Sequence, residues 1–381
     1  MWSASYYGRL EVINLENAQI VEKAIPESAF YKEEIQFQPE GKSVELRKII
    51  LGEGVEKLED LAFNRCVKLE EIVLPSTLHE LGDASFFFCR ALKSIEIPEG
   101  VTTTGYQTFY GCLSLEKVSL PGTLKEIEDC AFYSNLGLTT INLPEGLERI
   151  GDTAITDTKI KELEIPNSVK ELGTGAIRYN MELERLVIGE GVTAIPEKFA
   201  TLCVSLSEII IPSSIRTIGE SAFSMSNLKE LILPEGVEQL GRHAFEYEKI
   251  EKLSLPSTLN QMEGARFDKW YALSYFECKA TVPPTLIYKS GDNVEGHSPV
   301  PVLYVPAESV ELYRNATGWN YFSNIVGVTN FPDLSEIEDV VADGGEEGAA
   351  VYYNLQGQRV NNPEGGVYIR VQGKKAEKVR L

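Results

Sequence analysis

Residues 69–89 read LEEIVLPSTLHELGDASFFFC, and close variants of this stretch recur along most of the chain. The apolar positions of this copy are Leu69, Ile72, Leu74, Leu78, Leu81 and Phe86. The first apolar group is closed by a proline or glycine, 22 or 23 residues from its counterpart in the next copy, at Gly52, Pro75, Pro98, Pro121, Pro144, Pro166, Gly189, Pro212, Pro234 and Pro256. Such a constant period is typical of solenoids, in which each copy is one turn of a coil.

The order of residues within one copy predicts how a turn is built. Ile72 and Leu74 lie two positions apart, so they face the same side of a strand. Pro75 has no N–H to donate and therefore ends that strand. Leu78 and Leu81 return on the opposite wall, and Gly82 marks the next sharp bend. Phenylalanines at one phase then fill the interior: Phe63, Phe86, Phe109, Phe132, Phe223, Phe245 and Phe267.

The consensus LxxIxLPxxLxxIGxxAFxxC resembles the BspA-type leucine-rich repeat of bacterial cell-surface proteins, from Leu46 to Cys278. The resemblance implies a right-handed leucine-rich-repeat coil, mainly β with short helical or 3-10 turns and with caps at both ends. It also implies a recognition or adhesion role with a protein ligand, since members of this family are associated with host extracellular-matrix proteins. A microbial surface protein is a second candidate ligand.

Composition divides the chain into five expected segments. Residues 1–45 form an N-terminal cap with an irregular first repeat, 46–280 the repeats, 281–331 a C-terminal cap, 332–350 an acidic linker and 351–381 a small hairpin-like tail. The tail alternates apolar and polar residues around a Pro/Gly turn. It resembles a short form of the C-terminal sorting domain that type IX secretion recognises.

The charge balance restricts the partners. Lys and Arg number 36 against 57 Asp and Glu, so the net charge is −21. Nucleic acid and anionic membranes require a basic face and are therefore not expected as partners. No apolar run approaches the roughly 20 residues of a membrane span. The first residues lack the apolar core of a signal peptide. We expect a monomeric, secreted or cell-surface protein whose targeting segment is not part of this sequence.

The residues that could support catalysis are few. The chain contains three histidines, His79, His243 and His297, and none of the common nucleophile, zinc-protease, P-loop or dinucleotide motifs. We therefore predict no enzyme activity, no cofactor and no metal. Asp60, Asp83, Asp129 and Asp152 recur at one phase. They could form a cation ladder or cap one-turn helices at the corners, and capping is the prediction.

Other residues raise similar alternatives. Cys66, Cys89 and Cys112 repeat at the 23-residue step without a CxxC pair. Disulfides between adjacent turns are conceivable, but buried free thiols are predicted, as they are for Cys130, Cys203 and Cys278. The loop from Gly291 to Gly296 lacks the EF-hand spacing, so a plain loop is preferred over a calcium site.

The side chains that flank the central Ile of each strand should face solvent. They form two columns, which end at Tyr275 and Glu277. One apolar stripe with a charged rim is typical of a protein-binding site, and we predict that it consists of Arg185, Val187, Glu208, Ile210, Glu230 and Ile232. Three β-branched residues could equally reflect strand preference alone. A structural spacer and a carbohydrate-binding protein remain alternatives, the latter needing exposed aromatic platforms from Trp2, Trp270 and Trp319.

Overall fold

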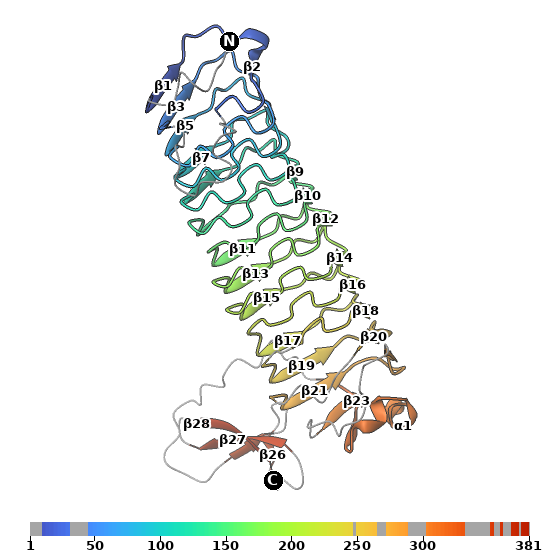
Figure 1. Cartoon of the computed structure of the whole chain (residues 1–381). Coiled ribbons are helices and arrows are strands. Elements are labelled where there is room, and N and C mark those ends of the chain that lie inside the picture. Colours follow the sequence, from blue (N-terminus) through green and yellow to red (C-terminus); the bar gives the residue numbers. More distant parts are fainter. Residues whose placement is uncertain are drawn as a thin grey trace. The chain divides into compact units, whose positions relative to one another are not determined.

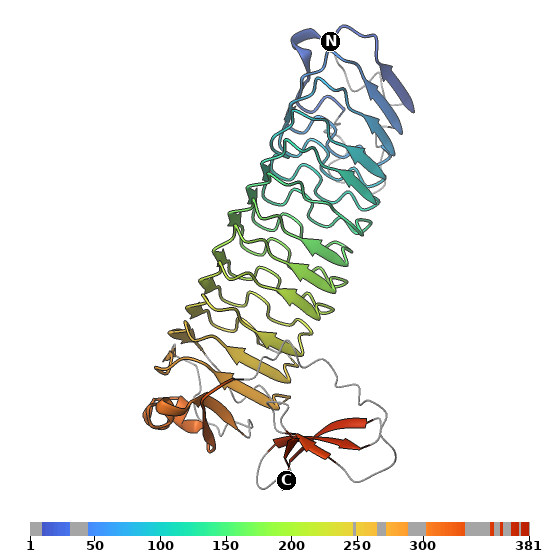
Figure 2. The ribbon, with the colours of Figure 1, turned by 180° about the vertical axis from the view of Figure 1, so that it is seen from behind.

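A computed structural model (Figures 1 and 2) gives the structure of the chain. It describes residues 10–30, 45–246, 249–264, 272–288, 302–331, 351–353, 359–360, 367–372 and 375–380. The chain divides into two compact units, Met1–Val326 and Gly327–Leu381. The predicted Phe267, the 332–350 linker and the 291–296 loop lie outside the described residues.

The apolar group before the proline or glycine forms a front strand on every described coil except that of residues 138–143, before Pro144 (Figure 1). These strands are β1 (Val12–Leu15), β3 (Lys48–Leu51), β5 (Glu71–Val73), β7 (Ser94–Glu96), β8 (Lys117–Ser119), β11 (Glu162–Glu164), β13 (Arg185–Val187), β15 (Glu208–Ile210), β17 (Glu230–Ile232), β19 (Lys252–Leu255) and β21 (Tyr275–Cys278). Pairing is parallel and in register, as in Ile13 with Ile49 and Ile49 with Ile72. Equivalent anchors therefore stack directly on one another.

The second apolar group forms short strands on the opposite wall (Figure 2). These back strands are β2 (Ala24–Ile25), β4 (Lys57–Leu58), β6 (Glu80–Leu81), β9 (Glu126–Ile127), β10 (Arg149–Ile150), β12 (Glu171–Leu172), β14 (Ala194–Ile195), β16 (Thr217–Ile218), β18 (Gln239–Leu240), β20 (Gln261–Glu263) and β22 (Thr285–Ile287). Apart from the 3-10 helix η1 (Val21–Lys23), the described coils turn their corners without helices. The first unit is thus a β-solenoid of about 11 turns, which confirms the predicted fold class.

The interior is filled by one column of phenyl rings. Phe30, Phe63, Phe86, Phe109 and Phe132 stack with centroids 5.0–5.4 Å apart and planes within 10° of parallel. Ile155 and Ile177 continue the buried column, and Phe199 and Phe223 resume it with an edge-on contact. Burial of each ring stabilises the fold by about 1.5–3 kcal/mol. This stabilisation is shared between neighbouring coils, because each ring packs against the next.

The corners after the front strands alternate between two kinds. Glu-Gly corners occur at Glu53, Glu99, Glu145, Glu190 and Glu235, and the intervening coils have Ser or Thr at 77, 123, 168, 214 and 258. Each of these hydroxyls donates to a carbonyl of the preceding coil, as Thr123 Oγ1 does to Val101 O at 3.0 Å. The Glu99 carboxylate in turn accepts the N–H of Gly122 at 3.0 Å. The coils are therefore fastened in pairs.

The last coil is covered by residues that follow the repeats. These form β23 (Leu303–Pro306), η4 (Ala307–Ser309), α1 (Val310–Asn315), η5 (Trp319–Tyr321) and β24 (Ile325–Val328). Trp319 is fully buried; its ring lies 6.2 Å from that of Phe276, and Nε1 donates to Pro284 O at 2.8 Å. The open end of the core is thus closed by aromatic side chains.

The second unit forms its own sheet. Its strands are β25 (Val351–Tyr353), β26 (Arg359–Val360), β27 (Val367–Gln372) and β28 (Lys375–Arg380), in the antiparallel order β26-β25-β27-β28. The sheet is larger than the expected hairpin because the single strand expected over 351–360 is instead two paired strands, β25 and β26, and because residues 375–380 add a further strand. The resemblance to a secretion sorting domain stays a prediction.

Candidate binding surface

The front strands present alternate side chains to solvent. In β5, β7, β8, β11 and β17 the middle residue is buried and its two neighbours are exposed. This is the period of two expected for a strand with one face on the core. Because every coil repeats the pattern, the outward side chains form two columns along the front face.

The predicted apolar stripe lies in the second column. Val187 and Ile210 are register partners on β13 and β15, and Ile210 is 45% exposed. Ile232, 40% exposed, lies on β17, which belongs to a different hydrogen-bonded sheet from β15. The structure thus pairs Val187 with Ile210 directly and places Ile232 beyond an interruption in the ladder. A second apolar pair that the sequence analysis did not select, the half-buried Ile50 and the exposed Val73, lies on β3 and β5.

Charged residues beside the stripe are largely paired with one another. Arg185 donates from Nε to Glu208 at 2.9 Å and from Nη1 to Glu164 at 3.2 Å. These hydrogen bonds, that to Glu208 first, raise the pKa of Arg185. Glu230 pairs with Lys252 on the next strand at 2.5 Å. Since the polar rim is satisfied internally, the apolar side chains are the part of this surface that a partner would desolvate most favourably.

The front face is not open along its whole length. Ser254, Tyr275 and Glu277 were expected to face solvent but are buried, Glu277 completely. The Glu277 carboxylate accepts hydrogen bonds from Ser254 Oγ at 2.6 Å and Tyr275 OH at 2.5 Å, and Lys279 Nζ lies 3.4 Å away. Burial, and then the Glu277 charge, raises the pKa of Tyr275. The expectation was wrong here because the alternation of a strand determines which way a side chain points, but not whether other residues cover that side chain.

The aspartate column has a structural role different in detail from the one predicted. Asp60 Oδ1 accepts the backbone N–H of Asp83 at 2.9 Å, and Asp129 Oδ1 accepts that of Asp152 at 2.8 Å. Each carboxylate therefore caps the next coil rather than a helix at its own corner. Among the described residues no group of His, Cys, Asp and Glu is arranged to hold a metal.

The cysteines are free thiols in the structure. Cys89 Sγ donates to Phe63 O at 3.2 Å, and Cys112 Sγ to Phe86 O at 3.2 Å, so this column fastens coils from inside. Burial raises the pKa of Cys66 and Cys112 to about 12.

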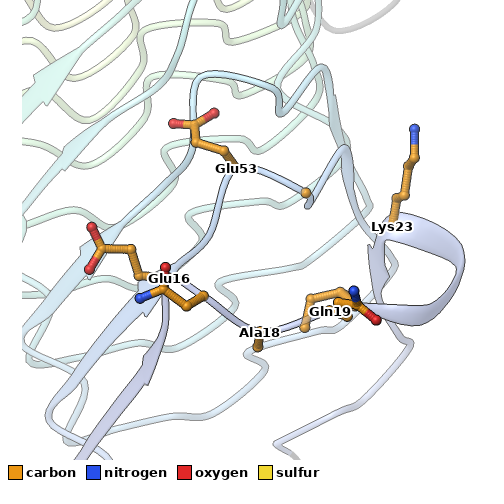
Figure 3. Close-up of a pocket in the computed structure, with 8 residues that line it drawn as sticks. Glu16, Ala18, Gln19, Lys23 and Glu53 are labelled. Carbon is orange, nitrogen blue, oxygen red and sulfur yellow. The ribbon is translucent and has the colours of Figure 1, made fainter.

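A shallow hollow of about 500 Å³ lies at the N-terminal coil (Figure 3). It arises because the first coil has three more residues between front and back strand than the next one. The carboxylates of Glu16 and Glu53 lie on one side of it and Lys23 on the other. Lys23 is paired with Glu56 at 2.6 Å, and Glu53 accepts the backbone N–H of Ser76 at 3.1 Å, so two of these three charged groups are already paired. This arrangement offers no catalytic constellation.

Two further predictions concern tryptophans and membranes. Trp319 is buried in the C-terminal cap, and Trp2 and Trp270 lie outside the described residues. Trp319 thus provides no aromatic platform for a sugar. In the part of the chain that the structure describes, no helix has the length and hydrophobicity needed to cross a bilayer.

Comparison with known protein families gives one match. The model of the BspA type leucine rich repeat region (6 copies) matches residues 7–137, 56–184 and 177–284, which together make up most of the chain. None of the curated proteins compared with the chain is significantly similar to it.

Several solved structures are similar to the chain. A leucine-rich repeat protein from Bacteroides ovatus is 21% identical with a TM-score of 0.46, over 83% of this chain and 92% of that one. A leucine rich cell surface protein from Faecalibacterium prausnitzii is 20% identical with a TM-score of 0.33, over 66% and 81%. The pneumococcal vaccine antigen PcpA is 19% identical with a TM-score of 0.38, over 75% and 80%.

Proposed function

Because the chain belongs to the BspA type leucine rich repeat family, we propose that it is an exported recognition protein that binds a protein ligand on its front face, without catalysis. The single observation that carries the proposal is the stripe of Val187, Ile210 and Ile232. These side chains lie outside the core on consecutive coils, beside charged groups that are already paired. A partner that covers them removes apolar surface from water without leaving a charge unpaired.

The chemistry of the chain favours a basic partner surface. A net charge of −21 attracts basic proteins at long range. The association should therefore weaken as salt concentration rises. A neighbour described as a cell surface protein supports, by analogy, an extracellular setting for this chain. Host extracellular-matrix proteins and microbial surface proteins are the ligand classes to test first.

The test is the double variant Ile210→Asp with Ile232→Asp. The wild-type chain is screened against extracellular-matrix and bacterial surface proteins, and the affinity of the best binder is measured by surface plasmon resonance. Placing two carboxylates in a desolvated contact should weaken binding at least about tenfold. The matched control is Leu113→Asp with Leu136→Asp, which changes two side chains of similar exposure away from the front face.

The outcomes separate the candidate functions. If the front-face variant is folded and binds as tightly as the wild type, the stripe is not the site. If no protein binds the wild type and a glycan array is also negative, the chain is a structural spacer. Binding on the glycan array alone would favour the carbohydrate alternative.

A further inference from the structure

Two exposed arginines lie at the edge where the chain returns from the back strands to the front strands. They are Arg65, on the coil that leads into β5, and Arg90, on the coil that leads into β7. Both guanidinium groups lie over the ring of Phe88, with Cζ 5.7 Å from the ring centroid for Arg65 and 5.3 Å for Arg90. These are cation–π distances. We call Arg65, Phe88 and Arg90 the arginine clamp.

The backbone and the next coil hold the clamp in place. The N–H of Arg65 donates to Phe87 O at 2.7 Å, so Arg65 lies beside the residue that precedes Phe88. A Cβ at Gly111 would lie 2.5 Å from Cε1 of Phe88. The half-buried phenyl ring therefore occupies the space that a side chain would fill on the next coil. Because the ring is fixed, the guanidinium groups that rest on it are ordered before a ligand arrives.

The positive charges of the clamp are not neutralised within the chain. Other arginines pair with carboxylates, namely Arg47, Arg149, Arg185, Arg216 and Arg314. Among the described residues, neither Arg65 nor Arg90 has a carboxylate within ion-pair distance, although the chain carries 57 Asp and Glu. Their N–H donors are therefore available to an anionic ligand.

The clamp lies in a part of the edge that lacks acidic residues. On four consecutive coils the segments that form this edge contain no Asp or Glu; they are residues 61–68, 84–92, 105–115 and 130–138. The charged residues of these segments are Arg65, Lys68 and Arg90, and Lys68 is already paired with Glu45 at 2.7 Å. On a chain with a net charge of −21, this edge is therefore a local cationic site.

An apolar strip follows the clamp along the solenoid. The N–H of Ser114 donates to Arg90 O at 3.1 Å, which places Leu113 beside the clamp. Leu113 is 38% exposed, and its counterpart on the following coil, Leu136, is 42% exposed. The combination suits a ligand that carries both negative charge and apolar side chains.

The aromatic rings of this edge favour a peptide over a sugar, which would need an exposed aromatic face. Tyr110 is stacked between its counterparts on the two neighbouring coils, with centroid distances of 5.1 Å to Phe87 and 4.8 Å to Tyr133. The ring of Phe88 already carries the guanidinium groups. The two leucines, in contrast, remain open to apolar side chains.

We propose that the arginine clamp binds the carboxylates of an acidic peptide segment, whose apolar side chains cover Leu113 and Leu136. A planar guanidinium group donates two parallel hydrogen bonds to one carboxylate, so the clamp takes two neighbouring acidic residues. This site differs from the front face in its position and in the charge of its ligand. Each site can therefore be tested without the other.

The test is fluorescence polarisation of labelled, capped heptapeptides with the full chain. The probe is Glu-Ser-Glu-Ser-Leu-Ser-Leu, used in both chain directions, because alternate residues of an extended peptide point to the same side. The control peptide Glu-Leu-Glu-Leu-Ser-Ser-Ser has the same composition but directs Glu and Leu to opposite sides. Salt is about 0.15 M, where the Debye length of about 8 Å limits the repulsion from the acidic body. The wild type should bind the probe about tenfold more tightly than the control peptide.

Variants of the clamp separate its role from that of net charge. Arg65→Ala with Arg90→Ala should weaken binding of the probe about tenfold or more, because both partners of the carboxylates are lost. Arg216→Ala with Arg314→Ala is the matched control, since it removes the same charge from two exposed arginines elsewhere, and it should stay within about twofold of the wild type. Phe88→Leu keeps both charges but removes the ring that positions them, and it should weaken binding severalfold.

The variants used for the front face provide the crossed control. Leu113→Asp with Leu136→Asp should weaken binding of the probe, and Ile210→Asp with Ile232→Asp should leave it unchanged.

Three results would overturn the proposal. The first is a wild type that does not bind the probe in either direction at about 1 mM. The second is a clamp variant, with both arginines replaced by alanine or with Phe88→Leu, that is folded and binds as the wild type does. The third is binding of heparin, but not of the probe, through the same arginines, since the site would then take an anionic glycan.

Discussion

At the scale of single residues, certain positions of the repeat form hydrogen bonds that hold neighbouring coils together. Asp60 caps the backbone of Asp83, and Cys89 donates to the carbonyl of Phe63. Gly82 has no positive φ; instead, a Cβ there would lie 2.5 Å from the backbone nitrogen of Asp60. Glycine is thus required by the close approach of two coils and not by the sharpness of the bend.

The buried thiols allow a test at this scale. Burial raises the pKa of Cys66, Cys112 and Cys203 to about 12 and that of Cys278 to about 11. A raised pKa means that the thiolate, the reactive form, is scarce at pH 8. Native protein treated with iodoacetamide at pH 8 should therefore be alkylated only at the partly exposed Cys130.

Mass spectrometry of peptides measures the modified positions, and the same treatment in guanidinium chloride should modify all six cysteines. Rapid alkylation of Cys66 or Cys112 in the native protein would show that the column is accessible. A disulfide between any two of them under oxidising conditions would likewise contradict the buried-thiol interpretation.

At the scale of elements, the sequence predicted the repeating strand, its inward anchors and its outward columns. The inward direction of Ile72 and Leu74 follows from the two-residue alternation of a strand alone. The end of that strand at Pro75 follows from the missing N–H of proline alone. Two features escaped this reasoning. The burial of Glu277 depends on what covers the front face at that strand, which the repeat pattern does not state. The pairing of coils is found only when the two types of corner are compared between successive copies of the repeat. The stripe at Ile210 was visible in sequence, while its interruption before Ile232 depends on hydrogen bonds that no local pattern encodes.

The paired corners lead to a prediction about stability. Thr123→Val removes a hydroxyl that accepts from Gly100 N at 3.0 Å and donates to Val101 O at 3.0 Å. We expect a loss of about 1–2 kcal/mol in the free energy of unfolding, because both backbone groups lose their side-chain partner. Urea denaturation followed by circular dichroism measures it.

Thr140→Val is the matched control. It makes the same change at an exposed threonine whose hydroxyl has no partner among the described residues. This variant should remain within about 0.5 kcal/mol of the wild type. Equal effects of the two substitutions would show that the corner hydroxyl does not fasten the coils.

At the scale of the whole first unit, stability is a sum of contacts between neighbouring coils, since each coil touches only the next. Phe86 lies in the ring column near the N-terminal end, and Trp319 covers Phe276 at the C-terminal end. Replacing either ring removes a fully buried side chain, and each should cost about 3–5 kcal/mol. In a compact globule both losses would be felt everywhere, whereas in a solenoid each should remain local.

Hydrogen–deuterium exchange distinguishes these cases. In Trp319→Ala, protection should fall in β19, β21 and β23 and stay unchanged in β3 and β5. Phe86→Ala should give the reverse pattern, so each variant is the control for the other. The free energy of local opening should recover with distance from the altered coil, because the intervening coils keep all their own contacts. If both variants instead lower protection evenly along the chain, the coils unfold as one cooperative unit, and the end cap then stabilises the front face at Ile210 as strongly as the coils that carry it.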